Sequence, residues 1–176
     1  LNFFTLYGTL KRLHEANIWN INLINSIYAT SCGSILALLL LSRIKWQELD
    51  AYLIDRPWQD VFNFDFNTLI RSVFDKGLIT IDYLEKIVEP IMKVNNWNMN
   101  ITLKELYDAT GIVLNLFATK FDNFNHVRFN YIKYPNLPVI SAIYMSSTLI
   151  PIFKPIKLMN TYYIDGFFCG KNNPIQ

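Results

Sequence analysis

The chain has 176 residues, of which 52% are hydrophobic and 17% are charged, and its formal net charge is +2. This length suits a single domain, and the apolar fraction is too high for a disordered chain. The small net charge, with no run of Lys and Arg, argues against nucleic acid as a partner.

Cysteine and histidine are scarce in the sequence. Cys32 and Cys169 are too few for a secreted disulfide framework, so the cytoplasm is the expected location. They do not have metal-binding spacing, and His14 and His126 stand far apart, so we expect no metal and no cofactor. The longest apolar run, 35–41, is shorter than the roughly 20 residues of a membrane-spanning helix. Any membrane contact is therefore expected to be peripheral.

In the first half of the chain, the apolar spacing predicts a helix, a strand and a second helix in close succession. The first helix is expected over 3–16, the buried strand over Ser26–Thr30, and an apolar helix over 31–43. The stretch 46–75 is rich in aromatic residues and is broken by Pro57 into at least two helices. The rings of 46–66, including Trp46 and Trp58, form either a lid at a lipid interface or a helical cap on the core, and we favour the cap.

The second half continues the alternation of helices and strands. Thr80 is predicted to cap a helix that Pro90 should kink or end, and Thr102 with Glu105 has the spacing of a capping box. Further elements are expected as strands over 112–119, 127–134 and 162–164, and as a helix over 137–149. This order predicts an α/β layered fold with a largely parallel sheet.

A candidate nucleophile lies where the first strand meets the apolar helix. The segment Ala29-Thr30-Ser31-Cys32-Gly33 resembles the G-x-S-x-G elbow, in which small residues let strand and helix pass closely and the serine hydroxyl is exposed. The positive end of the helix dipole would favour an alkoxide on Ser31. The alternative is that Ser31 is an ordinary N-cap. Cys32 is expected to pack as a small apolar residue, with its backbone N–H helping to bind an oxyanion.

A carboxylate is the better candidate than histidine for activating this serine. His14 precedes Ser31 and His126 precedes Asp165, which is the wrong order for a Ser-Asp-His triad unless a histidine follows the last residue. Asp165 follows a predicted strand, at the edge where α/β sheets bind ligands. Gly166 is expected to adopt unusual backbone angles that aim Asp165 inward. The alternative is an ordinary Asp-Gly turn.

Five stretches, taken in order, resemble the patatin-like phospholipase family. They are Tyr7-Gly8-Thr9-Leu10-Lys11, Ala29 to Ser34, Leu116-Phe117-Ala118-Thr119, Ala142 to Pro155, and Tyr163-Ile164-Asp165-Gly166 with Asn172-Asn173-Pro174. Enzymes of that family are serine acyl hydrolases with a three-layer α/β/α fold and a Ser–Asp dyad. The resemblance implies that Ser31 is the nucleophile and Asp165 the proton acceptor, with Ala29, Cys32, Gly33 and Gly166 around them.

The resemblance also implies what the protein acts on. Its substrates would be phospholipids or other acyl lipids, cleaved as carboxylic esters through an acyl-enzyme. Because a carboxylate exposed to water is a weak base at neutral pH, the dyad requires Asp165 to be partly buried. The competing interpretation is a catalytically impaired lipid-binding or scaffold domain of the same fold.

The sequence departs from the family pattern in two places. Ala29 stands where the elbow has its first glycine. The family's glycine-rich oxyanion loop should lie just ahead of the first helix, and its basic residue and following glycine fall on Asn2 and Phe3. The chain is therefore expected to be a single patatin-like domain over 1–176, a fragment lacking the first strand and that loop.

Overall fold

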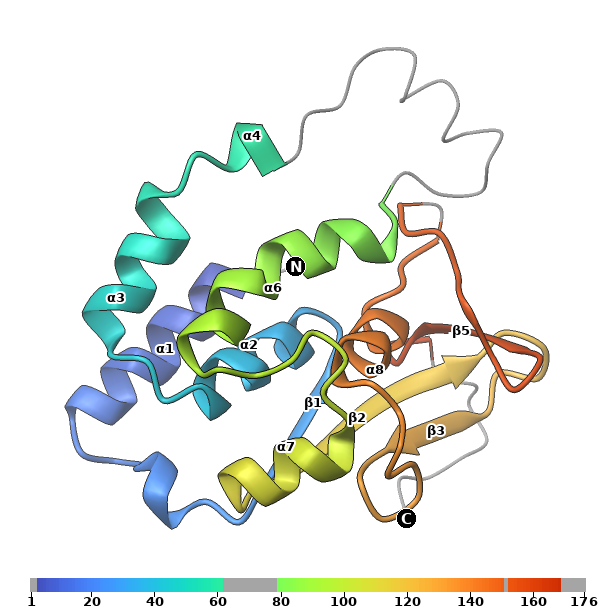
Figure 1. Cartoon of the computed structure of the whole chain (residues 1–176), viewed down its shortest axis with the longest axis horizontal. Coiled ribbons are helices and arrows are strands. Elements are labelled where there is room, and N and C mark those ends of the chain that lie inside the picture. Colours follow the sequence, from blue (N-terminus) through green and yellow to red (C-terminus); the bar gives the residue numbers. More distant parts are fainter. Residues whose placement is uncertain (1–2, 62–78, 151, 169–176) are drawn as a thin grey trace.

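The computed structural model describes residues 3–61, 79–150 and 152–168 of the chain. Figure 1 shows helices gathered along one side of a small twisted sheet. Several sequence predictions fall outside the described residues, namely those on Phe62, Phe64, Phe66, Phe74, Cys169 and 172–174.

The first part of the chain follows the sequence prediction closely. Its elements are α1 (Phe3–Glu15), the 3₁₀ turn η1 (Ile21–Leu23), β1 (Ser26–Thr30), α2 (Cys32–Leu41), α3 (Trp46–Asp50), the π-helical turn η2 (Ala51–Asp55) and α4 (Trp58–Val61). Pro57 separates η2 from α4, as predicted. Arg56 is extended, with φ −66° and ψ 134°, because the ring of the following proline disfavours the helical region.

The second part contains both confirmed and corrected predictions. Its elements are α6 (Ile81–Val94), α7 (Leu103–Thr110), β2 (Val113–Lys120), β3 (His126–Phe129), α8 (Val139–Ser146), β4 (Lys157–Leu158) and β5 (Thr161–Asp165). The capping box of Thr102 and Glu105 is present, and Gly111 ends α7 with φ 70°. Pro90 does not end α6, which continues to Val94.

Strand β3 is shorter than predicted because the chain turns at Asn130. The side-chain amide of Asn130 donates to the side-chain oxygen of Asn115 at 3.0 Å, and its oxygen accepts from the backbone N–H of Lys133 at 3.0 Å. Such local bonding by asparagine favours a turn over a continuing strand.

Strand β2 is the centre of the sheet, and its pairing positions the site. Residues Leu116 and Phe117 pair with both β1 and β3, whereas Ala118 and Thr119 pair with both β3 and β5. A strand has only two edges, so β1 and β5 share one edge of β2 while β3 occupies the other. Because β1 is parallel to β2 and β5 is antiparallel, the C-terminal ends of β1 and β5 face each other along that edge.

The α/β fold class is confirmed, and the described sheet is mixed rather than largely parallel. The β1–β2 pair is parallel, whereas β2–β3, β2–β5 and β4–β5 are antiparallel. A parallel pair needs a long crossover, which α2 to α7 supply between β1 and β2. The short turn between β2 and β3 permits only an antiparallel return. Among the named strands of the described residues, the predicted parallel pairing is therefore found only between β1 and β2.

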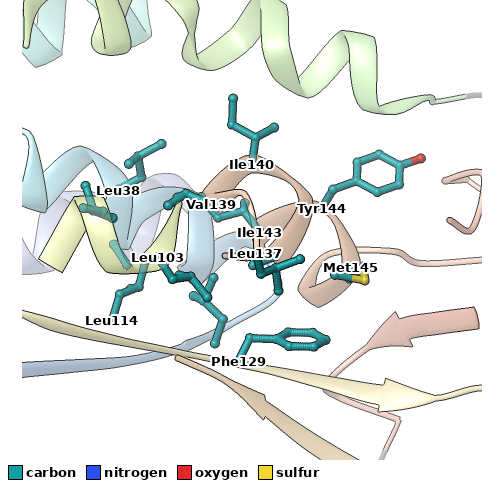
Figure 2. Packing of buried hydrophobic residues seen from close by; sticks show 14 of the residues in the cluster. Leu38, Leu103, Leu114, Phe129, Leu137, Val139, Ile140, Ile143, Tyr144 and Met145 are labelled. Carbon is teal, nitrogen blue, oxygen red and sulfur yellow. The ribbon is translucent and has the colours of Figure 1, made fainter. Parts of the chain in front are cut away.

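Helix α2 is buried on several sides, as its continuous apolar sequence predicts. Ala37, Leu38 and Leu41 join the main core with α8 and the sheet, whereas Leu36 and Leu39 join a second cluster with α1, α3 and α6. Figure 2 shows the main core, where side chains of α8 lie over Phe129 of the sheet. Burying each of these leucines stabilises the fold by roughly 1.5–3 kcal/mol, so packing on two sides fixes the position of α2 and of its first turn.

Candidate active site

Ser31 lies in a strained turn between β1 and α2. Its φ of 55° and ψ of −138° fall in a region that non-glycine residues rarely adopt, at a cost of about 1–3 kcal/mol. Ser31 occupies the N-cap position of α2, yet its side chain makes no capping hydrogen bond. The ordinary N-cap interpretation predicts such a bond and therefore leaves the strain unexplained.

The end of α8 holds the strained turn in place. The backbone N–H of Ser31 donates to the carbonyl of Ser146 at 3.0 Å, and the Ser147 hydroxyl donates to the carbonyl of Ser31 at 2.9 Å. Both groups of the Ser31 backbone are thus bound by consecutive residues of one segment. Such external bonds are what allow a strained conformation to persist.

Asp165 ends β5 and is anchored to the same segment. Its backbone N–H donates to the carbonyl of Thr148 at 2.8 Å, and its Oδ1 accepts from the backbone N–H of Phe167 at 2.8 Å. Only 3% of the residue is exposed, which meets the expectation of a partly buried carboxylate. Residues 146–148 therefore form hydrogen bonds with both Ser31 and Asp165 and link the two residues.

Gly166 is required by close packing. A Cβ atom there would lie 2.4 Å from the Thr30 hydroxyl and 2.5 Å from the Phe117 carbonyl oxygen. Gly166 does not have a positive φ, so the prediction that it supplies unusual backbone angles is wrong. The close contact instead brings the residue after Asp165 against the residue before Ser31.

Ser31 and Asp165 line one cavity of about 890 Å³. This volume is within the range of ligand-binding pockets, and the walls are mainly apolar. Apolar residues of the walls include Ile35, Leu53, Trp58, Leu84, Ile87 and Val88. The cavity can accept an apolar chain beside a hydroxyl and a carboxylate.

Comparison with known proteins identifies the family. A family model described as Patatin-like phospholipase matches residues 7–176. The chain belongs to the patatin-like phospholipase family. It is also 26% identical over 148 residues to "Probable lipid hydrolase 463L" of Invertebrate iridescent virus 6, a match that covers 83% of this chain and 50% of that protein. The patatin-like chain thus spans half the length of the curated relative it matches.

The other predicted elbow residues of this patatin-like chain differ in how closely the surrounding atoms pack against them. Ala29 pairs with Leu116 and packs its methyl group against the main core, which explains how alanine is accommodated there. Cys32 begins α2 and lines the cavity, and its N–H belongs to the helix turn that lacks internal acceptors. A Cβ at Gly33 would meet nothing within 4 Å, so the expectation that close packing requires a small residue there is wrong.

Neither histidine is among the residues that line this cavity. His14 lies on α1, and its Nδ1 accepts from the indole N–H of Trp46 at 3.0 Å. His126 begins β3 opposite Thr119. Both rings are half-buried. The aromatic stretch divides between the two interpretations, because Trp46 packs on α1 whereas Trp58 lines the cavity.

A buried hydroxyl pair beneath the turn is missed by sequence reasoning. The Ser146 hydroxyl donates to the Phe117 carbonyl at 2.6 Å and lies 2.9 Å from the Ser34 hydroxyl, so Ser34 must donate to Ser146. Both serines are fully buried. The available signal is the run 146–148 of small hydroxyl residues at the end of an apolar helix, which suits buried hydrogen bonding better than apolar packing.

Proposed function

We propose that this patatin-like domain hydrolyses carboxylic esters of lipids, with Ser31 as the nucleophile and Asp165 as its proton acceptor. The observation that carries the proposal is that both residues line one apolar cavity, at strand ends that face each other along β2. The family match and the viral relative named as a lipid hydrolase support lipid hydrolysis in general.

The reaction proceeds through an acyl-enzyme. Asp165 takes the Oγ proton as Ser31 attacks the ester carbonyl, and the developing negative charge lies at the N-terminus of α2. The N–H of Cys32 donates to that oxyanion. The C–O bond of the ester then breaks, and the proton on Asp165 passes to the leaving alcohol or lysolipid. Water attacks the acyl-enzyme by the same route and releases the fatty acid.

The environment of Asp165 suits this role. Its Oδ1 is held by the N–H of Phe167, so we assign proton transfer to Oδ2. Burial limits competition from water for the carboxylate, and the Thr148 carbonyl fixes the backbone. A pre-positioned base needs little reorganisation during the reaction, which lowers the barrier.

Exposed apolar side chains at the cavity mouth favour a lipid substrate presented by a membrane surface. Phe4 is 62% exposed and Phe167 81% exposed, and both line the cavity together with the exposed Ile152 and Phe168. Exposed apolar patches of this kind mark interaction sites, and aromatic rings favour the headgroup level of a bilayer. Within the described residues no helix is long and apolar enough to cross a bilayer, so we propose peripheral contact.

A fluorophosphonate tests the proposal, because it reacts only with an activated serine. We expect labelling of the protein at Ser31, loss of the label in Ser31→Ala, and hydrolysis of a panel of lipid esters by the unsubstituted protein. Cys32→Ala is the control for a thiol nucleophile and should keep most of the activity. Lipid binding without labelling or hydrolysis would overturn the proposal of an enzyme and favour the alternative of a non-catalytic lipid-binding domain.

A further inference from the structure

Helix α6 has a gap in its backbone hydrogen bonding that another segment fills. Pro90 lacks an N–H, so the carbonyl of Lys86, four residues earlier, loses its helical donor. The Nη2 of Arg56 donates to that carbonyl at 2.9 Å. The guanidinium thus replaces the missing helical bond.

The next carbonyl of α6 is bound by the same segment. The carbonyl of Ile87 accepts from the hydroxyl of Tyr52 and, at 3.4 Å, from Nη1 of Arg56. Nη1 also donates to the Tyr52 hydroxyl at 2.6 Å. Two successive carbonyls beside Pro90 therefore hold the segment 52–56 against α6.

Arg56 also orders the aromatic rings next to it. Its guanidinium carbon lies 5.1 Å from the ring centroid of Tyr52 and 5.0 Å from that of Trp58, within cation–π range. The indole N–H of Trp58 donates to the Leu53 carbonyl at 2.9 Å. Tyr52, Leu53 and Trp58 line the cavity, whereas Arg56 is not among its lining residues.

We propose that Arg56 is a positioning residue for acyl-chain selectivity. By binding the carbonyls beside Pro90, it holds the wall made by Tyr52, Leu53 and Trp58 at a set distance from Leu84, Ile87 and Val88 of α6, all of which line the same cavity. That spacing decides how long an acyl chain the cavity accepts. The inference rests on the proposed lipid hydrolysis, and it adds the residue that sets the chain-length preference.

The first test compares Arg56→Gln with the unsubstituted protein on p-nitrophenyl esters. Their acyl chains range from about four to about sixteen carbons, which covers short and long chains. We expect kcat/KM for the longest ester to fall by about tenfold relative to the shortest, mainly through KM, as if about two methylenes fewer were buried. Arg12→Gln, on the exposed face of α1, should leave the ratio unchanged. An equal loss on all chain lengths, or no loss, would overturn the proposal.

Two further variants guard against a merely misfolded protein. Pro90→Ala restores an N–H to Lys86 and strengthens the helix, so it should shift the chain-length ratio in the same direction without loss of folding. Arg56→Lys keeps the charge but not the fork that reaches two carbonyls, and it should not restore the ratio. An unchanged ratio in Pro90→Ala, or full rescue by lysine, would contradict the assigned role.

A binding measurement separates this proposal from the catalytic one. In a Ser31→Ala background, energy transfer from tryptophan to parinaric acid reports occupation of the cavity without turnover. We expect Arg56→Gln to raise the Kd by about tenfold, the same loss of buried chain as above. An unchanged Kd would overturn the role of Arg56 whatever the catalytic result. Hydrolysis retained by Ser31→Ala would overturn the nucleophile assignment while this measurement still tests Arg56.

Discussion

The turn around Ser31 and the wall made by Tyr52, Leu53 and Trp58 bound the same cavity but are held in different ways. The turn is fixed through its own backbone, because the N–H and the carbonyl of Ser31 both form hydrogen bonds with buried residues at the end of α8. The wall is fixed by side chains, chiefly one guanidinium and the rings beside it. Substitutions at the turn should therefore reduce the rate on every ester, whereas substitutions in the wall should change which chain is preferred.

The largest effect is expected at the two site residues. Ser31→Ala and Asp165→Asn should each lower kcat by about 10⁴-fold or more, because nucleophile and base act as one unit. His14→Ala and His126→Ala should leave hydrolysis nearly intact, since neither lines the cavity. Initial rates on a short-chain ester measure all four variants. Activity that depended on either histidine would show that the base has been misassigned.

Gly166→Ala comes next, because it tests the close contact between β5 and β1. The new methyl group would overlap the Phe117 carbonyl, so we expect a loss of about 1–3 kcal/mol in unfolding free energy and a clear loss of turnover. Gly33→Ala is the matched control, since a Cβ there meets nothing within 4 Å. Thermal melts and kcat of the two variants should differ sharply. Equal behaviour would contradict the packing described at Gly166.

Ser147→Ala tests whether the hydrogen bond to the strained turn supports catalysis in addition to stabilising the fold. It removes the hydrogen bond to the Ser31 carbonyl and should lower kcat several-fold with little change in KM, alongside a stability loss of about 1 kcal/mol. Ser42→Ala is the control: its buried hydroxyl donates to Leu39 at 2.6 Å and is not among the cavity residues. It should lose similar stability but no activity. Full activity in Ser147→Ala would mean that the turn does not need this bond.

The smallest effect is expected where α3, at the base of the wall, meets α1. The Asp50 carboxylate accepts from Lys11 and from the Tyr7 hydroxyl, and the hydrogen bond from Lys11 is the main cause that lowers its pKa. A lowered pKa in the folded state means that this stabilisation is present at neutral pH and is lost as the pH falls through the folded-state pKa. The melting temperature should therefore fall less between neutral and acidic pH in Asp50→Asn than in the unsubstituted protein. An equal fall in both proteins would mean that other groups cause the acid sensitivity.

Much of the fold could be predicted because its signals are local. The strand Ser26–Thr30, the capping box at Thr102 and the break at Pro57 each depend on residues within a few positions of one another. The burial of α2 follows from its continuous apolar run. Predictions failed where long-range contacts decide, as for the direction of most strand pairs and the reason for Gly166.

The sequence by itself determined a strand, a sharp turn at Ser31 and an apolar helix, since backbone preference and apolar spacing act over a few residues. Only the tertiary structure decided that Asp165 ends beside that turn, because β5 pairs with the part of a β2 edge that β1, on the same edge, leaves unpaired. It also decided that residues 146–148 bind both partners and that Arg56 reaches the gap beside Pro90. Hydrogen bonds between distant segments form only once the layers have packed, so no local sequence pattern predicts which residues they join.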